Sequence, residues 1–256
     1  MSRPASEWSK KTTKSAKDKD KAGKRPKAEK FRREFSANVS HELKTPLTSI
    51  LGYAELLDAG LVQEADKAEF IRRIRREAER MIELVEHIML LSHLDEGNSE
   101  EMFEPVDLTG LVTEVLHGAT VKAERYQVSL HHDGPDIELL ASPTLLSELV
   151  HNLVDNAIKY NRPGGLVTVT TSHQDQLVTL VVADNGIGIP AGSVARVFER
   201  FYRGDESRSK ATGGTGLGLA IVKHIALAHR ADISLDSQEG RGTTITVRFP
   251  AAPALA

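Results

Sequence analysis

The chain has 256 residues, of which 40% are hydrophobic and 27% are charged, and its formal net charge is −3. This length and composition indicate one or two ordinary globular domains. The absence of cysteine excludes disulfides, thiolate metal sites and cysteine nucleophiles, and no apolar run approaches the 18 residues that a membrane span needs.

Residues 1–29 are predicted to form a disordered, basic leader. The first 30 residues hold eleven Lys and Arg against four Asp and Glu, a net charge of +7 that leaves −10 for the remainder. Such a solvated segment has too few aliphatic residues to fold. Contact with anionic lipid and a cloning remnant are the alternatives, and no nucleic-acid site is expected because no aromatic residue lies between Lys10 and Lys30.

A helical hairpin is predicted for residues 30–97, with helices over about 30–59 and 65–96. Apolar residues repeat at spacings of three and four in both helices. One hairpin cannot bury two such seams, so pairing with a second copy into a four-helix bundle, a homodimer, is expected. The charged run at 72–79 is expected to be a solvated face, although it would also suit an acidic partner. The two seams are Val39, Leu43, Leu47, Ile50, Ala54 and Leu57, then Ile71, Ile74, Ala78, Met81, Val85 and Ile88.

His41 is predicted to lie on the solvent side of the first helix, about 200° around from the neighbouring seam residues. An exposed imidazole beside Glu42 suits nucleophilic or general-base chemistry, because a carboxylate can fix the tautomer of the ring. Thr45, four residues on, shares this face. Pro46 gives no N–H to the carbonyl of Glu42 and is expected to bend the helix. Taken alone, the pattern also fits an ordinary surface histidine.

Residues 98–105 are predicted to be a linker, residues 106–250 a second domain and residues 251–256 a tail. Helices are expected at about 108–126, 142–160, 193–201 and 217–230, and strands at about 128–132, 137–140, 166–172, 176–183, 232–237 and 243–249. Ser142 and Pro143 are the N-cap and first residue of the second of these helices. The α+β order predicts an α/β sandwich in which helices cover one face of a mixed sheet. His131 and His132 alternate along a strand, so no metal pair is expected.

The helix after Ser142 carries a polar face made by Asn152, Asn156 and Lys159, which lie within about 60° of one another. Two amides and an ammonium suit a polyphosphate with Mg²⁺, because this ion needs only one or two protein oxygens. Polar helix faces are usually just solvated, so the trio requires support from elsewhere in the chain.

Two glycine-rich segments give that support. Asp184 follows a buried strand and precedes Gly186 and Gly188, where a carboxylate could accept a hydrogen bond from the exocyclic amine of adenine. A dinucleotide fingerprint is excluded here, because Pro190 interrupts it and no βαβ unit follows.

The second segment, residues 213–218, opens a helix whose N-terminus suits phosphate, although no P-loop motif is present. The intervening residues are either a mobile lid or core: Phe198, Phe201, Tyr202, Arg203, Arg208 and a polar run to Thr212.

These segments, in this order, resemble the sensor histidine kinases of two-component signalling, over roughly residues 30–250. The resemblance is to the subgroup with a two-helix dimerisation and phosphoacceptor domain followed by a GHKL-type ATP-binding domain, and around His41 it is to the phosphate-regulon sensor branch. The matching motifs are an H box at 41–47, an N box at Asn152, Asn156, Lys159 and Tyr160, glycine boxes at Asp184, Gly186 and Gly188 and at Gly214, Gly216 and Gly218, and a phenylalanine box at Phe198 and Phe201.

The resemblance implies an ATP-dependent kinase that phosphorylates His41, with Glu42 as general base, and passes the phosphoryl group to an aspartate of a response regulator. Asn156 would bind Mg²⁺ and Asp184 the adenine amine. Thr45 would orient water for dephosphorylation of the regulator. The other nucleotide-binding residues implied are Asn152, Lys159, Tyr160, Gly186, Gly188, Gly214, Thr215, Gly216, Leu217, Gly218 and Thr244.

Three other readings remain open at the level of sequence. They are a chaperone-type or repair-type ATPase of the same superfamily, a scaffold that binds ATP without turnover, and a protein that acts mainly as a regulator phosphatase. Since no sensory or membrane segment is evident, the signal is expected to arrive through a partner, or the chain is the cytoplasmic part of a longer membrane sensor.

Overall fold

The computed structural model describes residues 35–96, 103–204 and 214–250. The predicted leader 1–29, most of the linker 98–105, the run from Arg208 to Thr212 and the tail 251–256 lie outside these residues. The chain divides into two compact units, Met1–Ile82 and Glu83–Ala256. The division falls inside helix α2 (Lys67–Asp95), so the C-terminal half of α2 groups with the residues that follow it.

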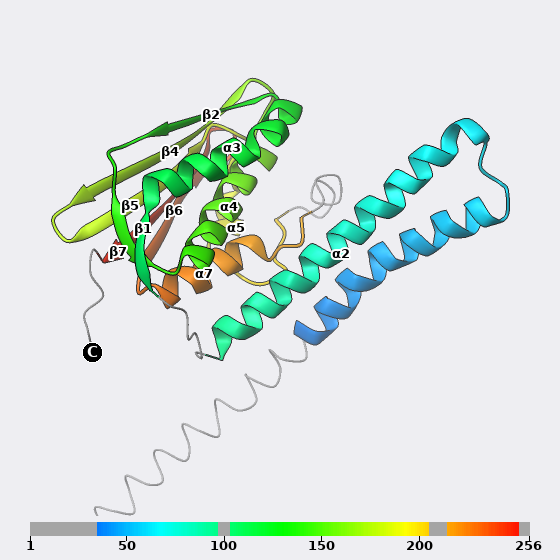
Figure 1. Cartoon of the computed structure of the whole chain (residues 1–256), viewed down its shortest axis with the longest axis horizontal. Coiled ribbons are helices and arrows are strands. Elements are labelled where there is room, and N and C mark those ends of the chain that lie inside the picture. The colour runs from blue at the N-terminus through cyan, green and yellow to red at the C-terminus, as the bar shows by residue number, and fades with distance from the viewer. Residues whose placement is uncertain (1–34, 97–102, 205–213, 251–256) are drawn as a thin grey trace, which may run out of the picture. The chain divides into compact units, whose positions relative to one another are not determined.

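The first unit is the predicted helical hairpin (Figure 1). It contains a helix over residues 35–58, a short 3₁₀ helix η1 (Glu64–Asp66) and the N-terminal half of α2. Gly60, with φ of +67°, ends the first helix. The N–H of Leu61 donates to the carbonyl of Leu56 and the N–H of Gly60 to that of Leu57, both at 3.1 Å. This pairing is the Schellman motif, which reverses the chain after a helix.

The first helix continues through Pro46, which is buried, so the proline does not end the helix. Hydroxyl groups next to the proline donate to the carbonyl oxygens one turn back: Thr45 Oγ1 to His41 at 3.2 Å and Thr48 Oγ1 to Lys44 at 2.8 Å. Such bonds compete with the helical ladder and are tolerated because they satisfy carbonyls locally.

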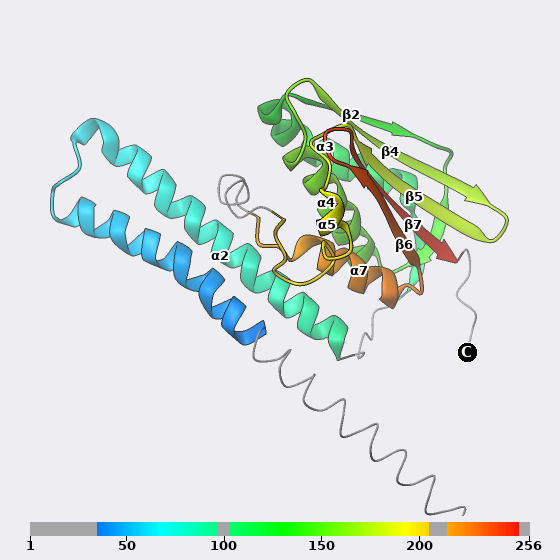
Figure 2. The ribbon, with the colours of Figure 1, turned by 180° about the vertical axis from the view of Figure 1, so that it is seen from behind.

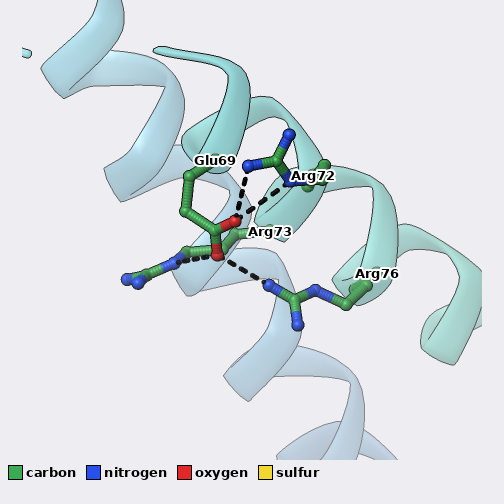
Figure 3. A network of polar contacts seen from close by, with 4 residues as sticks. All are labelled: Glu69, Arg72, Arg73 and Arg76. Atoms are coloured by element: carbon green, nitrogen blue, oxygen red, sulfur yellow. Dashed lines mark hydrogen bonds and ion pairs between the residues drawn. The ribbon is translucent and has the colours of Figure 1, made fainter. Parts of the chain in front are cut away.

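The N-terminal half of α2 carries a charged cluster on its solvated face (Figure 3). The carboxylate of Glu69 accepts hydrogen bonds from Arg72 at 3.0 Å, Arg73 at 3.1 Å and Arg76 at 3.0 Å. Arg73, followed by Arg72, holds the pKa of Glu69 below its usual value. The three guanidinium groups stay about half exposed, as predicted for this face.

Large apolar side chains of the hairpin remain exposed in the single chain. Leu47 is 55% exposed, Leu51 57%, Ile71 59% and Ile82 59%. A hairpin that leaves this much apolar surface in water requires another surface to cover it.

The second unit is built on a five-stranded mixed sheet of order β2-β4-β5-β7-β6. Only β2 and β4 are parallel. Three helices cover one face of the sheet, as predicted (Figures 1 and 2). The strands are β1 (Glu104–Asp107), β2 (Val128–Asp133), β3 (Glu138–Ala141), β4 (Gly165–Gln174), β5 (Leu177–Asp184), β6 (Asp232–Gln238) and β7 (Gly242–Pro250), and the helices are α3 (Leu108–Tyr126), α4 (Pro143–Lys159), the four-residue α5 (Ala191–Val194) and α7 (Gly218–Ala228).

Helix α4 forms the centre of the helical layer and carries much of the core. Ser142 caps it by accepting a hydrogen bond from the N–H of Leu145, and Pro143 occupies the first turn, both as predicted. Leu146, Leu149 and Val150 are fully buried. The side of α4 that faces away from this core is therefore free to carry polar groups.

Two elements differ from the sequence prediction. Residues 104–107 form strand β1, antiparallel to β3, although residues 98–105 had been predicted as linker; only Val106 of this strand is buried, so no alternating pattern marks it. The helix predicted at 193–201 is α5 followed by turns over residues 195–201, and Phe201 in these turns has a φ of +62°.

His131 is exposed and His132 half-buried, as expected for neighbours on a strand. Among the described residues, no group of three or more His, Asp or Glu side chains could hold a metal ion.

Candidate functional site

The imidazole of His41 projects from the first helix into solvent, with 79% of the side chain exposed. Its Nδ1 lies 3.7 Å from Oε1 of Glu42, whose side chain is 19% exposed. A carboxylate at this distance favours the tautomer with hydrogen on Nδ1 and leaves the Nε2 lone pair as the nucleophilic position. The predicted exposure of His41 and its pairing with Glu42 are therefore present in the structure.

The second unit contains a cavity of about 770 Å³ between α4, the end of β5, the N-terminus of α7 and β7. A cavity of this size is in the range that holds nucleotides and drug-sized ligands. The residues that line it include most of those predicted to bind nucleotide: Asn152, Asn156, Lys159, Tyr160, Asp184, Gly188, Gly214, Thr215, Gly216 and Gly218.

Asn152 is held in one orientation by α4 itself. Its Nδ2 donates to the backbone carbonyl of Glu148 at 2.9 Å and to Oε1 of the same residue at 2.7 Å. Both amide hydrogens are thereby engaged, so Oδ1 faces the opposite way, toward the start of α7. A Cβ atom on Gly218 would lie 2.7 Å from this oxygen and 3.5 Å from Nδ2 of Asn156. Glycine is therefore required where α7 begins against the two amides.

Lys159 and Tyr160, at the C-terminal end of α4, lie against the second glycine-rich segment. A Cβ atom on Gly214 would approach Nζ of Lys159 to 2.9 Å and the hydroxyl of Tyr160 to 3.3 Å. An ammonium next to the N-terminus of α7 gives this end of the cavity a positive potential, which suits phosphate.

Asp184 ends strand β5 at the other side of the cavity. Its Oδ1 accepts the N–H of Gly186 at 2.8 Å. Burial raises the pKa of the Asp184 carboxyl above its usual value, while backbone hydrogen bonds from Gly186 and Thr243 act in the opposite direction. A partly buried carboxylate with a remaining acceptor position suits a neutral donor such as the amine of adenine.

Three residues predicted to bind nucleotide do not line the cavity, and their roles stay predictions. Thr244 pairs with Ala183, whereas its neighbour Thr243 pairs with Asp184 and lines the cavity, because successive strand residues face opposite sides. Leu217 is fully buried in the core. Gly186 lies behind the cavity, where a Cβ atom would approach the carbonyl of Tyr160 to 2.4 Å.

Other lining residues were not predicted to bind nucleotide. Tyr202, in the segment described as lid or core, lines the cavity and donates to Oγ of Ser193 at 2.9 Å, while the guanidinium of Arg196 lies 4.3 Å from its ring centroid. Ile245 also lines the cavity. The alternation of side chains along β7 places Thr243 and Ile245 on the same face of the strand, and the sequence pattern could have predicted this. His87, from α2, could not be placed there by any sequence pattern.

Both halves of the chain match known family models. Residues 31–97 match the His Kinase A (phospho-acceptor) domain, and residues 141–253 match the histidine kinase-, DNA gyrase B- and HSP90-like ATPase. The mycobacterial sensor histidine kinase MprB, whose structure is solved, is 33% identical to this chain. The match covers 59% of this chain and 99% of the MprB chain, with a TM-score of 0.51. This chain belongs to the sensor histidine kinases.

Longer sensor histidine kinases match over most of this chain. SenX3 of Mycobacterium tuberculosis is 40% identical over 228 residues, which are 87% of this chain and 55% of SenX3. The chain thus spans about half the length of this curated relative. ShkA, solved in complex with AMPPNP, is 28% identical to this chain. The match covers 86% of this chain and 46% of ShkA, with a TM-score of 0.64. No helix in the described ranges is both long and apolar enough to cross a bilayer.

Proposed function

We propose that the chain is an ATP-dependent protein-histidine kinase that phosphorylates itself on His41 and transfers the phosphoryl group to an aspartate of a response regulator. Residues 30–97 act as the dimerisation and phosphoacceptor domain, and residues 106–250 as the ATP-binding domain. The protein works as a homodimer, in which a second copy covers the exposed apolar residues of the hairpin.

The observation that carries the proposal is the solvent-exposed His41 with a carboxylate 3.7 Å from its Nδ1. An ATPase without a phosphoacceptor needs no such pair. The cavity supplies the second half of the reaction, since it offers a carboxylate for the base at one side and amides, an ammonium and a helix N-terminus for the phosphates at the other. The structure of ShkA, which is similar over 86% of this chain, was solved in complex with AMPPNP.

The chemistry follows from the tautomer of His41. Nε2 attacks the γ-phosphorus of ATP, the bond from that phosphorus to the β,γ-bridging oxygen breaks, and ADP leaves with the electron pair. The ring then carries a phosphoryl group on Nε2 and a positive charge, which Glu42 relieves by accepting the Nδ1 proton. An aspartate carboxylate of the regulator next attacks the phosphorus while Glu42 returns the proton to Nδ1, so that the Nε2–P bond breaks and a neutral imidazole leaves with the electron pair.

Mg²⁺ fits this site through Asn156, whose amide oxygen is one of the few protein ligands that this ion requires beside phosphate and water. Bound Mg²⁺ neutralises charge on the phosphates. Lys159 would position the phosphates, and Asp184 with Thr243 would position the base. Asn152, whose amide hydrogens are both engaged by Glu148, would present its oxygen to a water molecule of the hydrated ion. Positioning and charge neutralisation supply most of what phosphoryl transfer needs.

Labelling with γ-labelled ATP separates this proposal from the two alternatives. A kinase gives protein label that is stable to base, labile to acid and absent from His41→Gln. Release of free phosphate without labelled protein would instead indicate a chaperone-type ATPase, and nucleotide binding with neither product would indicate a scaffold.

A regulator-phosphatase activity is a second proposal, favoured by the hydroxyl of Thr45. Its hydrogen is donated to the carbonyl of His41 at 3.2 Å, so the oxygen is left as an acceptor that can orient a water molecule one turn from the histidine. Thr45→Ala is expected to abolish dephosphorylation of the regulator and to leave phosphorylation of His41 intact. Equal loss of both activities would contradict separate roles.

We also propose that the signal reaches this kinase from outside the residues 30–250. A membrane connection, through the basic leader or through a sensor segment of a longer protein, is compatible with a chain that spans about half of SenX3.

A further inference from the structure

The C-terminal half of α2 contributes Glu83 and His87 to the lining of the nucleotide cavity within the second unit. Nε2 of His87 lies 3.5 Å from Oε1 of Glu148 on α4. Only 13% of the His87 side chain and 31% of the Glu148 side chain are exposed. The pair therefore lies in an environment where an ionic hydrogen bond is weakly screened by water.

Glu148 connects this pair to the nucleotide site. The same oxygen, Oε1, that faces His87 also accepts Nδ2 of Asn152 at 2.7 Å. The hydrogen bond from His87, with a smaller contribution from Asn152, holds the pKa of Glu148 below its usual value in spite of burial. Glu148 is thus kept ionised, and an ionised carboxylate accepts from both neighbours at once.

The second ring nitrogen of His87 does not explain why an imidazole is buried at this position. Its Nδ1 is buried and has no hydrogen-bond partner in the described part of the chain. Burying an unpaired polar atom costs free energy that a leucine or methionine at this position would not cost. The contact from Nε2 to Glu148 is the interaction at this position that an apolar residue could not make.

We propose that His87 is a positioning residue for nucleotide binding: it fixes the carboxylate of Glu148, which in turn fixes the amide of Asn152 with Oδ1 toward the phosphate end of the cavity. This inference rests on the proposed nucleotide site and extends it to a residue of α2. Without His87, the Glu148 carboxylate, whose side chain is 31% exposed, turns to water. The amide of Asn152 then loses its second acceptor and rotates, so that it presents N–H and O in a mixture of orientations.

The test is the dissociation constant of a fluorescent ATP analogue with Mg²⁺, measured on the full chain carrying His41→Gln so that no phosphorylation occurs. His87→Leu keeps the volume but removes the donor, and is expected to raise the dissociation constant about 5–10-fold, the effect of losing one hydrogen bond. His87→Gln retains an amide donor near the position of Nε2 and is expected to bind within about twofold of the parent. His93→Leu, an exposed histidine on the same helix, is the matched control.

The double mutant decides whether the effect passes through Glu148. Glu148→Ala alone is expected to weaken binding at least as much as His87→Leu, and His87→Leu should add nothing in that background. Equal binding by His87→Leu and the parent, a full additive effect in the Glu148→Ala background, or failure of His87→Gln to restore binding would overturn the proposal. If His87→Leu does not fold, the His87→Gln and Glu148→Ala chains still test it. Absence of binding by the parent itself would refute the proposed nucleotide site and not the role of His87 alone.

Discussion

Gly218→Ala is expected to separate stability from nucleotide binding. Gly218 opens helix α7, and its missing Cβ leaves the space that Oδ1 of Asn152 occupies. A methyl group there would sit 2.7 Å from this oxygen, closer than a carbon and an oxygen can approach. The amide of Asn152 must therefore rotate away from its observed position.

The size of the effect follows from the bonds that this rotation breaks. Asn152 donates two hydrogen bonds to Glu148, at 2.9 and 2.7 Å. At a net value of about 0.5–1.5 kcal/mol each, their loss costs about 1–3 kcal/mol. Replacing a helical glycine by alanine stabilises the folded state by up to about 1 kcal/mol, which offsets part of this loss. The free energy of unfolding should thus fall by only about 0–2 kcal/mol, whereas the dissociation constant for Mg²⁺·ATP should rise about 10-fold or more, because the phosphate end of the cavity is altered.

Isothermal titration calorimetry and denaturant unfolding measure the two quantities on the same sample. The matched control is Gly118→Ala on α3, where a Cβ atom would meet nothing within 4 Å. This substitution should stabilise the protein by about 0.5–1 kcal/mol and leave nucleotide binding unchanged. Unchanged binding by Gly218→Ala would refute the close approach of α7 to the N box.

Three further predictions concern the base, the titration of the site and the dimer. Thr243→Val is expected to weaken ATP binding severalfold while Thr244→Val does not, and the reverse result in a binding titration would restore the original assignment of Thr244. Burial raises the pKa of Asp184 above its ordinary 3.8. Because ATP binding uses the ionised carboxylate of Asp184, the affinity for ATP should be at its full value above this raised pKa and should fall as the pH falls through it. Asp184→Asn should weaken binding about 10–100-fold and remove this acid limb from the pH profile of affinity; a limb that persists in the variant belongs to another group. Leu51→Glu places a charge on a side chain that is 57% exposed in the single chain. Light scattering should find a monomer, and a stable dimer would show that another surface joins the two copies.

Much of the nucleotide site was predictable from sequence because it is built from local patterns. The helical period places Asn152, Asn156 and Lys159 on one face of α4, and the structure has all three at the cavity. Ser142 and Pro143 mark the start of that helix by their own chemistry. The glycines at 214, 216 and 218 occupy positions where side chains would collide with α4 or with Phe201.

What the sequence did not predict depends on tertiary contacts. Thr243 and Thr244 are chemically equal, and only the register of β7 against β5 decides which one faces the cavity. Strand β1 exists because β3 pairs with it, not because its four residues prefer extended backbone. His87 reaches Glu148 across 61 positions, which no local period encodes.

The kinase function depends on whether His41 accepts the γ-phosphoryl group of ATP. The most direct measurement is mass spectrometry of the purified chain after incubation with ATP and Mg²⁺, under basic conditions that preserve phosphohistidine. A mass increase of one phosphoryl group is expected, mapping to the peptide that contains His41 and absent from His41→Gln, which should still bind ATP. A phosphoryl group on another residue, or an unmodified His41 in a chain that hydrolyses ATP, would contradict it.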